Sequence, residues 1–450
     1  RRTDAFLNKE FHKKQNFFSF SDIDSERKDR IMKFTSTEAT PAPHVPPGVL
    51  RLTGAAKEDI PMYRIQTMNK ISPVGLNRFP SELYEVGDAV QDPQGILVRS
   101  AKLLDLEFNP GLLAIARAGV GVNNIPLDRC AAAGIPVFST PGANANAVKE
   151  LVICAMLMGS RDIPGAIRWV REQAASGVDV STVVEKGKSA FIGPELYKKT
   201  LGIIGLGAIG SIVANTAISL GMDVYGYDPF LSVDTALRLD RHVHVVKDIN
   251  DLYKRSDYIT MHIHYTEKTA RMIDASAIAA MKRGVRVINL ARGEIVDDEA
   301  MLTALDTGMV AAYITDFPNN RLLTAPHVIA MPHLGASTPE SEQNCAAMAV
   351  DTLRDYLESG NIRSSVNLPE MTMDRSGVQR LCVLHKNVPG MLANITSLFG
   401  RDGVNVENLS NKSRGDYAYT MVDLGSKVGD NVIEDVRRTA NVIRVRSLEW

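Results

Sequence analysis

A glycine-rich segment contains the first residues of this sequence whose types and spacing could do chemistry. Gly205-Leu-Gly207-Ala-Ile-Gly210 follows the apolar run Leu201-Gly-Ile-Ile204 and opens a helix-like apolar stretch. In that context Gly205 permits a tight turn, Gly207 lets a pyrophosphate approach the backbone, and Gly210 lets the helix pack against the strand. The first turn of such a helix offers free N–H groups and the positive end of its dipole to phosphates. The motif predicts a dinucleotide site, with a plain glycine turn as the alternative.

The next apolar run ends in a residue that indicates which dinucleotide is bound. Asp228 follows the run Asp223-Val-Tyr-Gly-Tyr227, where a carboxylate can accept hydrogen bonds from the hydroxyls of an adenosine ribose. Pro229-Phe-Leu231 comes next, so a ribose 2′-phosphate would meet a negative charge and no cation. The sequence therefore predicts NAD as the cofactor in preference to NADP. We assign Ala208 and Ile209 to the same site.

Short apolar runs alternate with helical stretches, and this pattern predicts the elements that position the glycine loop. A strand opens at Met62, and further strands are expected at residues 95–98, 112–116 and 135–138. After a long buried helix at 144–159, strands are expected at 201–205, 223–227, 258–262, 285–289 and 328–331. Strands alternating with helices form doubly wound parallel sheets. The expected fold class is α/β, with two doubly wound Rossmann-like lobes.

The first lobe is expected to be discontinuous in the sequence. We predict a substrate-binding lobe at 62–160 and 337–366, because a helix that begins near Ser337 usually returns to the first unit in this architecture. A nucleotide-binding lobe is expected at 161–336. From Gln379 the pattern changes, which predicts a small α+β domain at 379–450. Residues 1–61 are polar and partly proline-rich, so we expect a poorly ordered extension there.

The composition excludes several classes of partner. Lys and Arg number 51 and Asp and Glu number 52, so a net charge of -1 gives no general attraction to nucleic acid or to an anionic membrane. The longest apolar run, at 150–159, is too short to span a bilayer. The four cysteines lack the spacing of a metal or redox site. We expect a cytoplasmic protein with reduced thiols and no bound metal.

Two further segments resemble signatures of the D-2-hydroxy acid dehydrogenase family. They are Asn289-Leu-Ala-Arg-Gly-Glu-Ile-Val-Asp297 and Pro332-His-Leu-Gly-Ala-Ser-Thr338, and with the glycine loop the resemblance covers residues 62–366. Hydride transfer between NAD and a 2-hydroxy acid needs an acid–base group for the hydroxyl proton and a cation for the carboxylate. The resemblance implies that His333 exchanges this proton and that Arg292 binds the carboxylate. A turn-capping histidine and a surface ion pair are the alternatives.

The family usually has a Glu that holds the catalytic His, and this sequence departs from that pattern. When the segment Ala311–Arg321 is aligned on Phe317-Pro318, the Glu position falls at Asn320. An amide cannot stabilise a protonated imidazole as a carboxylate does. Asp316 is the nearby carboxylate that could take a related role. We assign Arg292, His333, Asp316 and Asn320 to the catalytic set, and Ala291, Arg292, Asp316 and His333 also to the cofactor site.

The first lobe resembles the phosphoglycerate dehydrogenase branch of this family. Val98-Arg-Ser-Ala-Lys102 and Ala116-Arg-Ala-Gly-Val-Gly-Val-Asn-Asn124 carry this resemblance. Arg99 is the expected phosphate ligand and Arg117 a second cation for anionic groups. The turn can present backbone N–H groups to a carboxylate. The predicted substrate residues are Arg99, Arg117, Gly119, Val120 and Gly121, with Lys102 and Arg161 as weaker candidates; cations held in solvent at strand ends are the alternative.

Residues 379–450 resemble an ACT regulatory domain. His385-Lys-Asn-Val-Pro-Gly-Met-Leu392 and Gly403-Val-Asn-Val406 carry the match. In serine-sensitive relatives the corresponding His and two Asn residues bind serine between paired domains, which maps the effector site to His385, Asn387 and Asn405. These polar side chains could instead cap turns. The resemblance implies L-serine as an effector and a homodimer or homotetramer.

The resemblance as a whole implies NAD-dependent oxidation of 3-phospho-D-glycerate to 3-phosphohydroxypyruvate, the first step of serine biosynthesis, inhibited by L-serine. A glyoxylate or hydroxypyruvate reductase on the same fold is one alternative, since fold does not decide substrate. An NAD-sensing transcriptional corepressor is an alternative of another class. It would bind NADH with little or no turnover.

Overall fold

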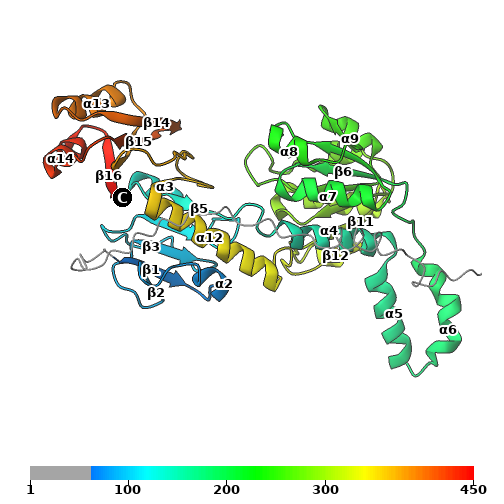
Figure 1. The fold of residues 1–450 in the computed structure, drawn as a ribbon. Helices are drawn as coiled ribbons and strands as arrows, with labels where there is room; N and C mark the ends of the chain where they lie inside the picture. The colour runs from blue at the N-terminus through cyan, green and yellow to red at the C-terminus, as the bar shows by residue number, and fades with distance from the viewer. Residues whose placement is uncertain (1–61) are drawn as a thin grey trace, which may run out of the picture. The chain divides into compact units, whose positions relative to one another are not determined.

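The computed structural model describes residues 62–450, and the extension predicted at residues 1–61 lies outside the described residues. Three β-sheets organise the described chain: two are parallel, and the third, near the C-terminus, is antiparallel (Figure 1). The predicted α/β class with two parallel-sheet lobes and a C-terminal α+β domain is confirmed.

The first sheet has five parallel strands in the order β2-β1-β3-β4-β5. Strands β3 and β4 are buried on both faces, which explains their continuous apolar sequences. The sequence pattern does not reveal β2, because this short edge strand mixes buried and exposed residues. The elements of this part are β1 (Tyr63–Met68), α2 (Pro73–Leu76), β2 (Tyr84–Gly87), β3 (Gly95–Val98), β4 (Ala114–Arg117), α3 (Leu127–Ala132) and β5 (Val137–Phe138).

Helix α12 (Pro339–Ser359) returns to this first sheet from the far side of the sequence. Its apolar face, which includes Ala349 and Leu353, joins the core formed by β1, β3 and β4. Thr338 caps its first turn, and Gly360 ends it in the left-handed conformation at a φ of 74°. The prediction that the first lobe is discontinuous is therefore confirmed.

The second sheet has seven parallel strands in the order β12-β11-β10-β9-β6-β7-β8. The order reverses between β6 and β9, and ligands of doubly wound folds bind at such a switch point. Its strands are β6 (Thr200–Ile204), β7 (Asp223–Tyr227), β8 (Val243–Val246), β9 (Tyr258–Met261), β10 (Val285–Asn289), β11 (Val310–Thr315) and β12 (Val328–Ala330). Its helices are α7 (Ala208–Ser219), α8 (Val233–Arg238), α9 (Ile249–Arg255), α10 (Ala275–Ala279), α11 (Asp298–Asp306) and the short η2 (Gly293–Ile295) and η3 (Leu322–Thr324).

Helix α4 (Ala145–Ser160) packs against the second sheet and not, as the predicted lobe boundary implies, against the first. Val152, Ala155 and Met156 belong to the core that α7 forms with the second sheet, although the boundary at residue 160 assigns this helix to the first lobe. Apolar periodicity reports that a helix is buried but not which sheet buries it.

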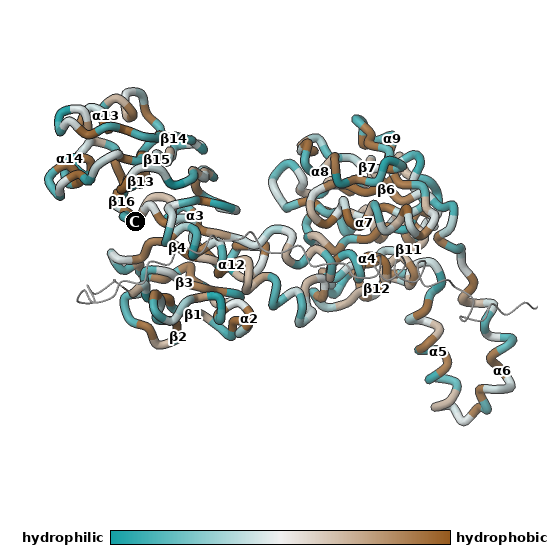
Figure 2. The backbone as a smooth tube through the Cα atoms, in the orientation of Figure 1, coloured by the Kyte–Doolittle hydropathy of each residue, from teal (hydrophilic) through white to brown (hydrophobic). Residues whose placement is uncertain are grey.

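Two helices after α4 expose apolar side chains. Helices α5 (Ile163–Ala175) and α6 (Val180–Gly187), followed by η1 (Lys188–Phe191), contain no buried residue. Hydrophobic residues nevertheless recur along α5 (Figure 2), and Ile163, Ile167 and Val184 are all exposed. Monomeric surfaces seldom leave such residues clustered without a partner.

The C-terminal part folds in the order β-α-β-β-α-β. Its antiparallel sheet has the strand order β14-β15-β13-β16, with both helices packed on the hydrophobic core of the domain. The elements are β13 (Gln379–Lys386), α13 (Met391–Arg401), β14 (Val406–Arg414), β15 (Tyr417–Leu424), α14 (Asp430–Arg438) and β16 (Val442–Glu449).

The last turn of α12 is capped by side chains of this C-terminal sheet. Arg446 donates to the carbonyl oxygens of Tyr356 and Leu357 at 3.0 and 2.9 Å, and Tyr419 donates to that of Gly360 at 2.6 Å. The carbonyl of Tyr356 also accepts from the backbone N–H of Gly360 at 2.9 Å, and the side-chain donors add to the hydrogen bonds at this buried helix end. In the described part of the chain, every helix is too short or too polar to cross a bilayer.

Candidate active site

The glycine loop lies where the sequence places it, between β6 and α7. Gly205 has a φ of +90°, a conformation that L side chains rarely adopt. A Cβ on Gly210 would collide with the carbonyl oxygen of Gly205, so a glycine is required for this close packing. A Cβ on Gly207 would meet no atom within 4 Å, and this open space lies at the start of α7. The loop can therefore hold a pyrophosphate against its backbone.

Asp228 directly follows β7 and faces the glycine loop. One carboxylate oxygen accepts a hydrogen bond from the backbone N–H of Leu206 at 2.9 Å, and the other accepts from Phe230 at 2.8 Å. Each carboxylate oxygen can accept more than one hydrogen bond, so capacity remains for ribose hydroxyls. The carboxylate and the loop together fit the adenosine end of NAD.

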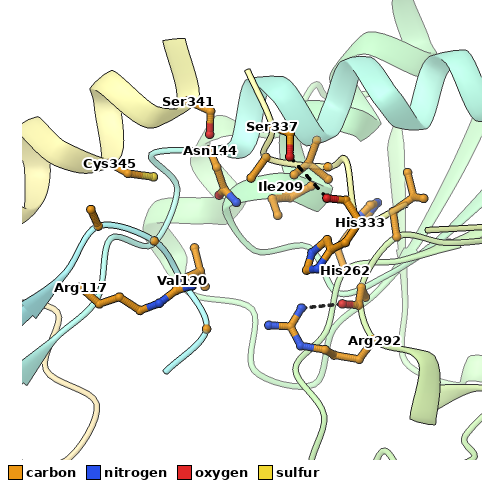
Figure 3. A pocket seen from close by; sticks show the side chains of 18 of the residues that line it. Arg117, Val120, Asn144, Ile209, His262, Arg292, His333, Ser337, Ser341 and Cys345 are labelled. Atoms are coloured by element: carbon orange, nitrogen blue, oxygen red, sulfur yellow. Dashed lines mark hydrogen bonds between the residues drawn. The ribbon is translucent and has the colours of Figure 1, made fainter. Parts of the chain in front are cut away.

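A pocket of about 270 Å³ brings together residues from both parallel-sheet lobes. In the second lobe, Arg292 comes from the loop after β10 and His333 from the loop after β12, while Arg99 and Arg117 lie at the ends of β3 and β4 (Figure 3). A Cβ on Gly121 would lie 2.8 Å from Nη2 of Arg292, so the glycine turn and this arginine are adjacent. The predicted site residues that line the pocket are Arg99, Arg117, Gly119, Val120, Gly121, Ile209, Ala291, Arg292 and His333.

Two weaker candidates do not reach this pocket. Lys102 and Arg161 are exposed and are not among its lining residues. Their charges face solvent, so a long-range effect on an anionic ligand would be screened by salt.

The arginines of the pocket differ in their counter-ions. Arg99 pairs with Glu342 of α12 at 2.7 Å. Arg117 has no ion pair within residues 62–450, and its Nε donates to the carbonyl oxygen of Arg99 at 3.1 Å. Burial lowers the pKa of Arg117, and the positive charges of Arg292 and Arg99 lower it further. An anion that enters this pocket would relieve the repulsion among the three cations.

Three histidines line the pocket, His262, His264 and His333, and they differ in burial. Burial lowers the pKa of His262 to about 4, so its imidazole is neutral at physiological pH. His333 is exposed at the pocket wall, and its ring lies 4.7 Å from that of Phe317. A group that exchanges a proton with substrate must reach both protonation states near neutral pH. His262 does not meet this requirement.

Asp316 lies beside the loop that bears His333, whereas Asn320 does not. Asp316 is 1% exposed, and one carboxylate oxygen accepts from the backbone N–H of Gly335 at 3.2 Å. Burial raises its pKa, and the charge of His333 opposes that rise. Asn320 is exposed and lines neither the pocket nor the neighbouring depression around Pro318, so the structure does not bring it to His333.

Comparison with known proteins places this geometry in a family. Residues 153–335 match the D-isomer specific 2-hydroxyacid dehydrogenase NAD binding domain. The chain is 31% identical to the D-3-phosphoglycerate dehydrogenase of Haemophilus influenzae over 379 residues, which cover 81% of this chain and 88% of that protein. The chain belongs to the D-isomer specific 2-hydroxyacid dehydrogenase family.

The chain spans just over half of the length of several other curated relatives. The D-3-phosphoglycerate dehydrogenase of Synechocystis is 36% identical over 326 residues, which are 70% of this chain but 56% of that protein. The crystal structure of an NAD+-bound 3-phosphoglycerate dehydrogenase from Entamoeba histolytica is 26% identical and superposes with a TM-score of 0.54, covering 68% of this chain and 99% of that one. The glycine loop and Asp228 thus belong to an NAD-binding domain.

Several pocket residues were not among the predictions for this family. Ser341, Glu342 and Cys345 come from α12, Asn144 precedes α4, and His262 follows β9. The α12 residues directly follow the Pro332–Thr338 signature, and this proximity is the one signal that could have drawn attention to them. Their direction depends on how α12 packs, which local sequence does not specify.

The predicted effector residues are not gathered in one copy of the C-terminal domain. His385 is buried, and its two ring nitrogens already bond to Lys386 O at 2.8 Å and to Thr420 Oγ1 at 2.9 Å. Asn387 and Asn405 are exposed, but they lie at opposite ends of the sheet. The strand register places them opposite residues nine positions apart at the two ends of β15, which corresponds to about 30 Å at the usual rise per residue. The structure therefore presents two of the three predicted residues to solvent, apart from one another.

Proposed function

We propose that this chain catalyses the NAD-dependent oxidation of 3-phospho-D-glycerate to 3-phosphohydroxypyruvate, the first step of serine biosynthesis. The observation that carries the proposal is the cluster of Arg99, Arg117 and Arg292 in one pocket with His333. Three cations suit a substrate with a carboxylate at one end and a phosphate at the other. In this proposal residues 62–160 and 337–366 form the substrate-binding lobe, residues 161–336 form the cofactor-binding lobe, and Arg292 and His333 of the latter also reach the substrate.

The residues of the pocket divide the chemistry between them. Bound NAD supplies the acceptor for the hydride that leaves C2 of the substrate. Arg292 holds the carboxylate through its fork of donors, which fixes C2 beside the cofactor. His333 takes the hydroxyl proton as the C2–O bond becomes a carbonyl, and the positive charge of Arg292 favours the developing alkoxide. Asp316 stabilises the protonated form of His333 from behind.

A substrate and cofactor panel tests the proposal. The full chain is assayed with 3-phospho-D-glycerate and D-glycerate, each with NAD and with NADP. We expect turnover with NAD to prefer the phosphorylated acid, because Asp228 disfavours the 2′-phosphate of NADP and the cation cluster favours the phosphate. Equal use of both cofactors, or a preference for D-glycerate, would refute it. NADH binding without turnover would instead favour a sensor role.

One observation favours a second candidate, a reductase of glyoxylate or hydroxypyruvate. The guanidinium of Arg99 is already paired with Glu342. If that pair persists with substrate bound, the pocket has less positive charge for a phosphate and suits a smaller acid. Reduction of hydroxypyruvate at a much higher kcat/KM than of its phosphorylated analogue would select this candidate.

We also propose that the C-terminal domain is an ACT regulatory domain and that L-serine binds between two copies. Asn387 of one copy and Asn405 of another can both face such an interface, because each is exposed. Since both ring nitrogens of His385 are occupied, the proposal assigns it a structural role. The apolar side chains exposed on α5 and α6 support a homo-oligomer through a separate surface.

A serine titration of the intact protein tests this regulation. Asn387→Ala should weaken inhibition by L-serine, whereas Asn431→Ala, an exposed Asn on α14 of the same domain, should leave it unchanged. Allosteric coupling is typically about 1–3 kcal/mol, so inhibition of several-fold to about a hundredfold is expected. Indifference of the intact enzyme to millimolar serine would rule the proposal out. A truncation before the C-terminal domain is unsuitable because it uncaps α12.

A further inference from the structure

One hydroxyl of the pocket is buried without a hydrogen-bond partner. Ser341 is 3% exposed and lines the pocket, and its Oγ bonds to no other atom of the described chain. Buried hydroxyls are nearly always bonded, because leaving one unpaired costs most of its hydration energy. A ligand that accepts a hydrogen bond at this point would remove that penalty.

Other features beside Ser341 fit the same kind of ligand. Oδ1 of Asn144 is also buried without a partner, so a flip of this amide would break no hydrogen bond of Oδ1 and would turn its N–H groups to a ligand that accepts. In Figure 3 Ser341 points from α12 toward Asn144, with Arg117 across the same space, while Arg292 and His333 lie at the opposite side. The pocket therefore has two ends, and the end away from His333 combines a free hydroxyl, an amide and a cation that has no carboxylate partner in the described chain.

The first turn of α12 adds a favourable field at this end. The helix has 21 residues, and Ser341 lies in its first turn, after the Thr338 cap. The start of a long helix carries a partial positive charge that stabilises anions. The turn also carries Glu342, but that carboxylate is engaged with Arg99.

We propose that Ser341, with Arg117 and the first turn of α12, forms the subsite that recognises the phosphate of the substrate, so that Ser341 is a specificity-determining residue. This inference rests on the proposed function, in which Arg292 and His333 hold the carboxylate and the reacting carbon. A phosphate monoester offers three oxygens, and it can accept from the Ser341 hydroxyl and the Arg117 guanidinium together. Asn144 can turn its amide to present its N–H groups to the third oxygen.

The experiment compares Ser341→Ala with Ser359→Ala, which removes a hydroxyl from the other end of the same helix. The measured quantity is the ratio of kcat/KM for 3-phospho-D-glycerate to kcat/KM for D-glycerate. Loss of a hydrogen bond to a charged group should lower this ratio about tenfold or more in Ser341→Ala. Ser359→Ala should leave the ratio unchanged. A Ser341→Ala enzyme that loses both substrates equally, or neither, would overturn the assignment.

A binding measurement separates this inference from the proposed function. Inorganic phosphate is titrated calorimetrically into the full chain and into both variants. We expect the wild type and Ser359→Ala to bind phosphate alike and Ser341→Ala to bind it about tenfold more weakly. If the wild type turns over neither substrate, the proposed function fails, and the phosphate titration alone decides the subsite. Equal phosphate affinity in all three proteins would reject it.

Discussion

Replacing Glu342 by Gln should strengthen the binding of a phosphorylated substrate. Glu342 pairs with Arg99 at 2.7 Å, and their side chains are 44% and 39% exposed. An ion pair this exposed is worth only about 0–1 kcal/mol, so its loss disturbs Arg99 little. The carboxylate, however, is a negative charge at the pocket wall, where it opposes an incoming phosphate.

The size of that opposition follows from the geometry of the pair. A phosphate held by Arg117 and Ser341, the residue next to Glu342, would lie about 6 Å from that carboxylate and carry a charge of about -2, which gives a repulsion near 1.4 kcal/mol in a water-like dielectric. This value exceeds the worth of the exposed pair. The KM for 3-phospho-D-glycerate should therefore fall about two- to tenfold in Glu342→Gln.

Steady-state kinetics at two ionic strengths test the reasoning. The KM for D-glycerate should be nearly unchanged, and the gain for the phosphorylated substrate should shrink as salt is added. Glu340→Gln is the matched control, because Glu340 lies in the same turn of α12 but is exposed and outside the pocket. A higher KM for the phosphorylated substrate in Glu342→Gln would show that Glu342 positions Arg99 and would refute the repulsion argument.

Five further substitutions have definite expected outcomes. His333→Ala should lower kcat about a hundredfold or more, while Arg292→Ala should mainly raise KM; a near-normal kcat in the former would exclude His333 as the proton carrier. Because burial raises the pKa of Asp316, the folded state binds this proton more tightly than the unfolded chain does, and stability is lost as pH rises through the raised pKa. Asp316→Asn should therefore raise Tm at pH 7 while lowering kcat, and an unchanged kcat would exclude Asp316 from the site. Because burial lowers the pKa of His262 to about 4, stability present above pH 6.5 is lost as pH falls toward 4, and His262→Gln should flatten the Tm profile between pH 7 and 5. Arg446→Met removes two hydrogen bonds from a buried guanidinium to carbonyls at the end of α12, which keep one donor each from Gly360 N and the Tyr63 hydroxyl, and should lower the free energy of unfolding in urea by about 1–3 kcal/mol; a loss below about 0.5 kcal/mol would show that these two bonds are dispensable.

The parts of the site that sequence predicts are those built by consecutive residues. The glycine loop needs Gly205 for its positive φ and Gly210 for its contact with Gly205, so a few adjacent positions carry the whole requirement. The same holds for Asp228, which follows directly on β7. A continuous apolar run locates β3 because a strand covered on both faces carries mainly apolar residues.

The parts that sequence does not predict depend on residues brought together from far apart. Arg99 and Glu342 are 243 positions apart, and nothing near either residue indicates the pair. Asn320 occupies the alignment position of the family Glu, yet the loop turns it to solvent while Asp316 stays buried beside Gly335. The predicted effector residues show the reverse case. They lie within 21 positions of one another in the sequence, but His385 and Asn405 lie at opposite ends of one sheet.

The sequence by itself determined the α/β alternation, the dinucleotide loop and the identity of the pocket arginines and of His333, because each follows from local periodicity or from a short motif with one steric solution. Tertiary structure decided which of those arginines has a counter-ion, which carboxylate lies buried beside the loop that bears His333, and that Ser341 faces the pocket without a partner in the described chain. The physical reason is that burial and charge pairing are properties of a packed neighbourhood. The neighbourhood of this pocket is assembled by α12, which returns from the far end of the sequence to lay its first turn against the ends of β3 and β4.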